Sequence, residues 1–161
     1  MASFWEDVFS GPGDGPHVGR VVVRLSEACV LGAVIGMERF REGKPPGLRT
    51  HMLVALGAAM FTLIPAEGKM TSGDLSRVIQ GVAAGIGFLG AGTILKLEDK
   101  HRIEGLTSAA SVWLTAAIGT AAGAGWIWVA FIGMLWGLII LFLIHRFDQK
   151  ELGKKNGKDG P

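Results

Sequence analysis

The stretch VGRVVVRLSEACVLGAVIGM, residues 18–37, is long enough to cross a lipid bilayer as a helix, yet it carries charges inside it. A bilayer core needs about 20 mostly apolar residues. Arg24 and Glu27 lie about one helical turn apart within this stretch. A charge at membrane depth is costly and persists only with a partner or a water-filled cavity. We therefore expect an integral membrane protein whose first span holds a polar element.

Four more apolar stretches follow the first, and only 19% of the 161 residues are charged, against about 25% in soluble domains. The predicted spans are residues 18–37, 48–65, 75–95, 106–125 and 126–144. Spans four and five are joined by AAGAGW, residues 121–126, which predicts a tight helical hairpin. The expected fold is an all-α membrane protein, a compact bundle of five transmembrane helices with no soluble C-terminal domain.

The chain divides into a short N-terminal segment, a membrane domain and a basic tail. Residues 1–17 are expected to be external or interfacial, with a short helix near Trp5; residues 18–145 form the membrane domain. Residues 146–161 form a solvated tail. Lys and Arg gather after spans one and three and in this tail. Basic loops stay in the cytoplasm, which predicts an outside N-terminus and a cytoplasmic C-terminus.

Several classes of function find no support in the sequence. A net charge of +2 is too small to indicate nucleic-acid binding, and the single Cys29 allows no intrachain disulfide. The four histidines show no metal-ligand spacing, and no nucleophile–base set indicates an enzyme. Gly85–Gly90 matches G-x-G-x-x-G, but it lies within an apolar span rather than after a soluble strand, so it predicts no dinucleotide site. We expect no cofactor, and a metal site stays open.

Polar residues inside the spans are the first candidates for a site. They are Arg24, Glu27, Gln80, Thr107, Ser108, Ser111 and Thr115. Arg24 and Glu27 form either part of a polar site between spans or a structural ion pair near the outer interface. The hydroxyls of span four either bond backbone carbonyls and neighbouring helices or line a permeation path.

Glycines inside the apolar spans indicate close helix packing, because small residues four apart let two backbones approach. The packing candidates are Gly32, Gly36, Gly81, Gly85, Gly87, Gly90 and Gly92. We expect spans one and three to pack together through Gly32, Gly36, Gly81, Gly85 and Gly92. We also expect glycine-rich faces to join two copies of the chain into a homodimer.

The loop ERFREGKPPGLRT, residues 38–50, holds four basic residues. They either set the topology and contact lipid headgroups, or they dock an acidic partner or an anion.

Together with flanking motifs, this loop resembles the bacterial MgtC/SapB family of inner-membrane proteins. The matching pieces are Arg24-Leu25, LGAVIGMER (31–39), GLRT (47–50), LVALGAA (53–59), GIGFLGAG (85–92) and GLTSAASVW (105–113). They agree in order and spacing over residues 20–145. In the cytoplasmic motif the resemblance points to Glu38, Arg39, Arg49 and Thr50.

The resemblance implies about five spans, a role in growth at low magnesium and, in pathogens, survival in macrophages. Some family members are reported to act on the F-type ATP synthase rather than to move magnesium. The chain is expected to lack the soluble C-terminal domain of longer relatives. It also carries Glu104 where many relatives have a basic residue and Glu27 where many have an apolar one.

We expect a non-enzymatic protein that is embedded in the lipid bilayer and acts by contact with other membrane proteins. The alternative is a transporter of magnesium or another small ion or solute. A transporter requires a polar cavity that reaches the midplane, whereas a regulator requires a filled core and an exposed partner face.

Overall fold

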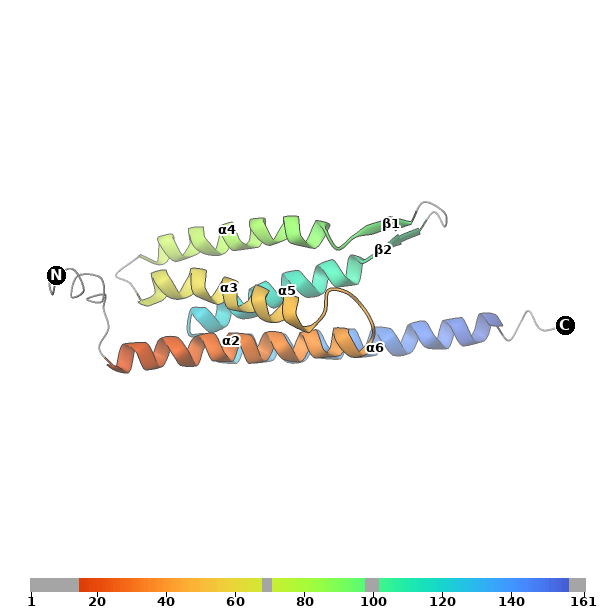
Figure 1. Cartoon of the computed structure of the whole chain (residues 1–161), viewed down its shortest axis with the longest axis horizontal. Coiled ribbons are helices and arrows are strands. Elements are labelled where there is room, and N and C mark those ends of the chain that lie inside the picture. The colour runs from red at the N-terminus through yellow and green to blue at the C-terminus, as the bar shows by residue number, and fades with distance from the viewer. Residues whose placement is uncertain (1–14, 68–70, 98–101, 157–161) are drawn as a thin grey trace, which may run out of the picture.

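A computed structural model describes residues 15–67, 71–97 and 102–156. Within these ranges there are five helices and one short hairpin (Figure 1). The elements are α2 (Gly15–Arg41), α3 (Leu48–Glu67), α4 (Ser72–Ala91), β1 (Leu95–Leu97), β2 (Arg102–Glu104), α5 (Leu106–Gly123) and α6 (Ile127–Asn156). The prediction of a helical protein is thus confirmed apart from the hairpin.

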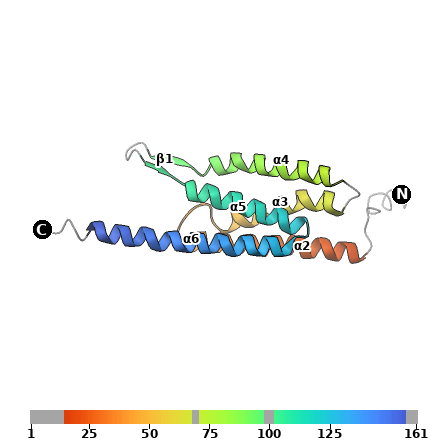
Figure 2. The same cartoon turned by 180° about the vertical axis from the view of Figure 1, so that it is seen from behind.

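The helices lie roughly side by side in a flat bundle, with α4 along one edge and α2 and α6 along the other (Figures 1 and 2). Helix α2 packs against α3, α5 and α6, whereas α4 packs against α3 and α5. The end of α2 and the starts of α3 and α5 lie at the same end of the bundle. We call this the basic end, because Arg39, Arg41, Lys44 and Arg49 belong to it.

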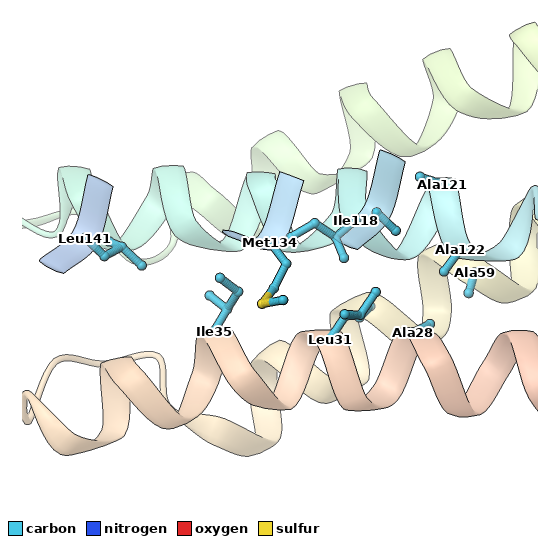
Figure 3. Packing of buried hydrophobic residues seen from close by; sticks show 11 residues of the cluster. Ala28, Leu31, Ile35, Ala59, Ile118, Ala121, Ala122, Met134 and Leu141 are labelled. Atoms are coloured by element: carbon cyan, nitrogen blue, oxygen red, sulfur yellow. The ribbon is translucent and has the colours of Figure 1, made fainter. Parts of the chain in front are cut away.

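The apolar core lies between α2, α3, α5 and α6 (Figure 3). Leu31 and Ile35 of α2 point toward Ile118 of α5 and Met134 of α6. Alanines make up much of this core, and they include Ala28, Ala55, Ala59, Ala121 and Ala122. Small side chains bring the backbones near to one another, which strengthens dispersion contacts between helices.

Glycines set the closest approaches between helices. A Cβ on Gly32 would lie 2.7 Å from Ala55 Cβ, and one on Gly36 would lie 2.8 Å from Leu48 Cα. The glycines of α2 therefore face α3, and the prediction that they meet span three, observed as α4, is wrong.

Two glycines of α5, which were not among the packing candidates, meet α3 just as closely. A Cβ on Gly119 would lie 2.7 Å from Ala55 Cα, and one on Gly123 would lie 2.7 Å from Ala59 Cα.

The remaining glycine candidates belong to α4 and its C-terminal end. A Cβ at Gly90 would make an ordinary contact with Ala109 of α5, at 3.7 Å, and one at Gly92 would approach the carbonyl oxygen of Leu89. At Gly81, Gly85 and Gly87 a Cβ would meet nothing within 4 Å. Most of the glycines of α4 therefore contact no other helix of this chain.

Two helices end at a glycine with positive φ. Gly43 has φ 64°, and the N–H of Lys44 donates to Arg39 O while the N–H of Gly43 donates to Phe40 O. Gly125 has φ 85° and ends α5 with the same pair of hydrogen bonds, to Ala121 and Ala122. This is the Schellman motif, which satisfies the last carbonyls of a helix. It closes the tight turn predicted between spans four and five.

Several boundaries differ from the prediction. Helix α4 ends at Ala91, not Leu95, because β1 pairs antiparallel with β2, Leu95 opposite Glu104. Alternating apolar and charged residues favour strands here. Helix α2 begins at Gly15, and α6 continues through the start of the expected tail to Asn156. The helix expected near Trp5 lies outside the described residues.

Two described helices are long and apolar enough to cross a membrane, judged by length and composition: Leu48–Ala66 and Leu106–Gly123. The described side chains of α6 add a shorter apolar stretch, Ile127–Leu143. Large apolar side chains also cover much of the outer surface, including Phe88, which is 85% exposed, and Trp128, which is 75% exposed. This apolar surface fits a lipid environment. By length and composition, two of the five predicted spans qualify as membrane-crossing helices.

Candidate functional site

The most polar part of the interior is a cluster at the basic end made of Arg39, His51, Ser108 and Ser111, which we call the polar cluster. Arg39 occupies the last turn of α2, where a cation is favoured by the helix dipole. Its side chain turns inward and is only 6% exposed. Arg39 Nη2 donates to Ser108 Oγ, 3.2 Å away in the first turn of α5. One guanidinium therefore joins the end of α2 to the start of α5.

The positive charge of Arg39 is only partly compensated by the neighbouring carboxylate of Glu38. Its Nη1 lies 4.0 Å from Glu38 Oε2, and the Glu38 side chain is 18% exposed. Arg39 Nε is buried and has no hydrogen-bond partner within the described residues. A buried charge that loses its remaining partners is strongly destabilising, so Ser108 and Glu38 are structurally important here.

His51 extends the cluster to α3 and is fully buried. Its Nδ1 lies 2.9 Å from Gly47 O, and its Nε2 lies 3.2 Å from Ser111 Oγ. A carbonyl oxygen only accepts hydrogen bonds, so Nδ1 carries a proton. The imidazole thus ties the first turn of α3 to α5.

Ser111 has a single hydroxyl proton and two neighbours that can accept it. Its Oγ lies 2.8 Å from Ser108 O and 3.2 Å from His51 Nε2. If the proton goes to Ser108 O, Nε2 can bond to Ser111 Oγ only by donating, which requires a cationic imidazole, and a neutral His51 then leaves Nε2 without this bond. If it goes to Nε2, His51 is neutral and the bond to Ser108 O is lost. The direction of this hydroxyl therefore depends on the protonation of His51.

The other hydroxyls of α5 divide into inner and outer ones. Thr115 is buried and its Oγ1 donates to Ser111 O at 2.8 Å. Thr107 is exposed. On α3, Thr62 is buried and its Oγ1 lies 3.1 Å from Thr120 O, across the contact with α5. These groups bond to backbone and to neighbouring helices, as hydroxyls in packed helices usually do.

Arg24 and Glu27 lie toward the opposite end of the bundle. Arg24 Nη1 lies 3.4 Å from Gly123 O and donates to it, at the C-terminal end of α5. Carbonyls at a helix C-terminus favour a cation, so Arg24 is placed to stabilise the turn between α5 and α6. Glu27 is half-buried, and no salt bridge joins it to Arg24 in the described chain.

The remaining candidates do not join the polar cluster. Arg49 is exposed and Thr50 is half-buried in the first turn of α3. Gln80 is exposed on α4 and does not contact the polar cluster. Within the described residues no group of three or more His, Cys, Asp or Glu side chains could hold a metal ion.

The model of the MgtC family matches residues 25–150 of the chain. This chain belongs to the MgtC family. Its polar cluster and both of its core-facing α2 glycines lie within the matched residues.

Relatives of this MgtC-family chain are found in several bacteria. SrpB of Synechococcus elongatus is 45% identical over 137 residues, which are 78% of this chain and 75% of SrpB. YhiD of Escherichia coli strain K12 is 36% identical over 140 residues, 83% of this chain and 64% of YhiD. MgtC of Brucella abortus is 45% identical over 103 residues, 63% of this chain and 41% of that protein.

The chain thus spans less than two thirds of YhiD and less than half of the Brucella MgtC. No solved structure matches it.

Sequence reasoning on this MgtC-family chain missed His51 and Thr62. Both are polar residues within an apolar helix, which is the same signal that singled out Glu27. His51 also lies four residues after Gly47, so its ring can reach the carbonyl that precedes its own helix. His51 has no metal-ligand spacing, so its structural role in joining α3 to α5 was not predicted.

Proposed function

We propose that this MgtC-family protein is an inner-membrane protein that supports growth at low magnesium by contacting other membrane proteins. It neither catalyses a reaction nor conducts ions. All five helices span the bilayer, with the N-terminus outside and the C-terminus in the cytoplasm. The basic end then lies at the cytoplasmic surface.

The observation that carries this proposal is the use made of the buried polar side chains. Arg39, His51 and Ser111 each bond to another helix or to a helix end. Thr115 bonds to its own helix. Ion transport needs polar groups that face a water-filled route. Groups already engaged in holding helices together favour a structural role, and leave the exposed basic residues, Arg41 and Arg49, to meet a partner.

The groove between α3 and α4 also supports a contact role. It has a volume of about 590 Å³ and is lined by apolar side chains and glycines, among them Leu53, Phe61, Val82 and Ile86. A hydrated cation gains no ligand from such a lining. Transport of magnesium or another small solute is the rival function, and its support is that YhiD is named as a candidate magnesium transporter.

The topology is tested by cysteine labelling in a Cys29→Ala background. Ser72 and Glu104 are both exposed and lie at opposite ends of α4 and its hairpin. A membrane-impermeant maleimide added to intact cells should label Ser72→Cys and spare Glu104→Cys. Labelling of Glu104→Cys in sealed cells overturns the orientation.

The function is tested by three measurements: magnesium flux with the purified protein, growth of a complemented strain, and co-purification of a partner. In liposomes, magnesium flux should equal that of empty liposomes, and flux well above that level overturns the proposal. In a strain lacking the gene, the double variant Arg41→Glu with Arg49→Glu should fold normally and fail to restore growth at low magnesium. Co-purification should recover a membrane protein with the wild type and lose it with this variant; the family resemblance suggests the F-type ATP synthase.

The matched control replaces exposed polar residues at the opposite end, Ser72→Glu with Ser76→Glu, which should restore growth. Equal failure of both double variants would show that the basic residues have no specific role.

A further inference from the structure

Helix α4 is the least covered helix of the bundle. Its inner side touches α3 and α5 through a narrow stripe of half-buried residues, Leu75, Val78, Ile79, Val82 and Ile86, and Gly90 is its one buried residue within the described chain. Figure 1 shows α4 at the edge of the bundle, with neighbours on one side. The opposite side of α4 is left open.

That open side carries a regular pattern. Six exposed residues recur at alternating spacings of four and three along it: Gly73, Arg77, Gln80, Ala84, Gly87 and Ala91. At about 100° per residue they lie in one sector, across the helix from the inner stripe. We call this sector the outer seam. Four of its six residues are glycine or alanine, which lets a second helix come close.

Gln80 is the second, independent observation. Its side chain is exposed, and it has no hydrogen-bond partner in the described chain. It lies eight residues after Ser72 in a helix that ends at Ala91, near the middle of the span. An amide left without a partner in hydrocarbon is costly. Lipid tails contain no hydrogen-bond donor or acceptor for the Gln80 amide, so the seam needs a polar partner at this depth.

A second copy of the chain provides that partner. The amide of Gln80 both donates and accepts, so it is complementary to itself. Around a two-fold axis along the membrane normal, two parallel α4 helices bring the same residue of each copy face to face. Arg77 lies closer to the start of the helix, where its long side chain can reach water. The two-fold axis also brings the two Arg77 residues to the seam, so the pairing requires both side chains to extend toward water rather than toward each other.

We propose that two copies of this protein associate through the outer seam of α4, with the Gln80 side chains hydrogen-bonded to each other. The inference rests on the proposed function only in requiring that α4 crosses the membrane. It adds the helix, the face and the polar contact that a dimer would use.

The test is disulfide cross-linking in native membranes, in a Cys29→Ala background. Single cysteines replace Ala84 or Gly87 on the seam, and Val129, which is 59% exposed on α6, is the control. A membrane-permeant oxidant should give covalent dimers with Ala84→Cys and Gly87→Cys and none with Val129→Cys. Adding Gln80→Leu should remove most of the dimer, whereas Gln80→Asn, which keeps the amide, should preserve it.

Other outcomes overturn the proposal in recognisable ways. A monomer at all three positions means that only lipid covers the seam. A cross-linked product of another mass means that a different protein covers it. Persistence of the dimer with Gln80→Leu removes the role of the amide. Labelling of Ala84→Cys by an impermeant maleimide would show that α4 lies outside the membrane, so the five-span proposal fails before the dimer is considered.

Discussion

Two helices carry the same pattern of glycines four residues apart in different surroundings: GAVIG, residues 32–36 of α2, and GVAAG, residues 81–85 of α4. In α2 a Cβ on either glycine would come within 2.8 Å of α3. In α4 a Cβ on either glycine would meet nothing within 4 Å. The pattern permits close approach in both helices, and only α2 uses it within one chain.

The difference lies in the partner helix rather than in the glycines. The α2 glycines face the backbone of Leu48 and His51 and the small side chain of Ala55. The α4 glycines border a groove that is also lined by Leu53 and Phe61 of α3, and no α3 atom lies close to them. A pair of glycines four residues apart therefore indicates that another helix can pack closely at that position. It does not identify which helix does so.

The largest effect is expected at Gly119, where α5 meets α3. In Gly119→Leu the new side chain would run into the Ala55 backbone, and the two helices would have to separate. Overpacking usually costs about 1–3 kcal/mol and more when backbone must move, so we expect no folded protein in detergent. The control, Gly19→Leu, adds the same side chain where a Cβ meets nothing within 4 Å, and it should keep the wild-type unfolding midpoint.

Arg39 should give the next largest effect. Arg39→Met removes a buried, charge-assisted hydrogen bond to Ser108, which is worth about 1.5–3 kcal/mol. Arg49→Met, at an exposed site in the first turn of α3, should change stability by no more than about 0.5 kcal/mol. Denaturation in mixed micelles measures both. Equal losses would mean that Arg39 does not clamp α2 to α5.

Thr62 should give a smaller loss. Its hydroxyl proton can serve Ala58 O, Ala59 O or Thr120 O, all within 3.2 Å. Thr62→Val keeps the shape and removes the bond, so we expect a loss of about 0.6 kcal/mol and at most about 1.7 kcal/mol. Thr107→Val, on the exposed side of α5, should lose nothing measurable in the same unfolding assay.

The smallest effect is expected at the start of α4, where Thr71 and Asp74 form a capping box. Hydrogen bonds from the Thr71 side chain, and then from its backbone N–H, hold the pKa of Asp74 below its usual value. The stabilisation is therefore complete above pH 4 or so, near the unfolded pKa, and is lost as the pH falls through the lower folded value. NMR of the Asp74 amide across that range should show the cap opening in acid, and Asp74→Asn should abolish the transition.

The sequence predicted much of the fold because the apolar stretches are long and the turns are marked by glycine. Helix α5 ended near its predicted boundary, and Gly125 closed the expected hairpin. The strands were missed because Leu95 continues the apolar run of α4, while the pairing of Leu95 with Glu104 depends on a residue beyond the turn.

The candidate site was predicted only in pieces. Arg39, Ser108 and Ser111 were each singled out, yet they were assigned to separate groups, one cytoplasmic and one within the membrane. Their contact depends on how α2, α3 and α5 align, which no local pattern contains. His51, which joins Ser111 to α3, was set aside because it lacked metal-ligand spacing.

The most direct test of this contrast replaces the second glycine of each pair with leucine and compares unfolding in the same detergent. In Gly36→Leu the new side chain meets the α3 backbone, so we expect loss of the folded state. In Gly85→Leu it enters the open groove beside α4, so we expect an unfolding midpoint within a few degrees of wild type. Equal, severe destabilisation by both substitutions would contradict the account, because it would mean that α4 packs against the core as closely as α2 does.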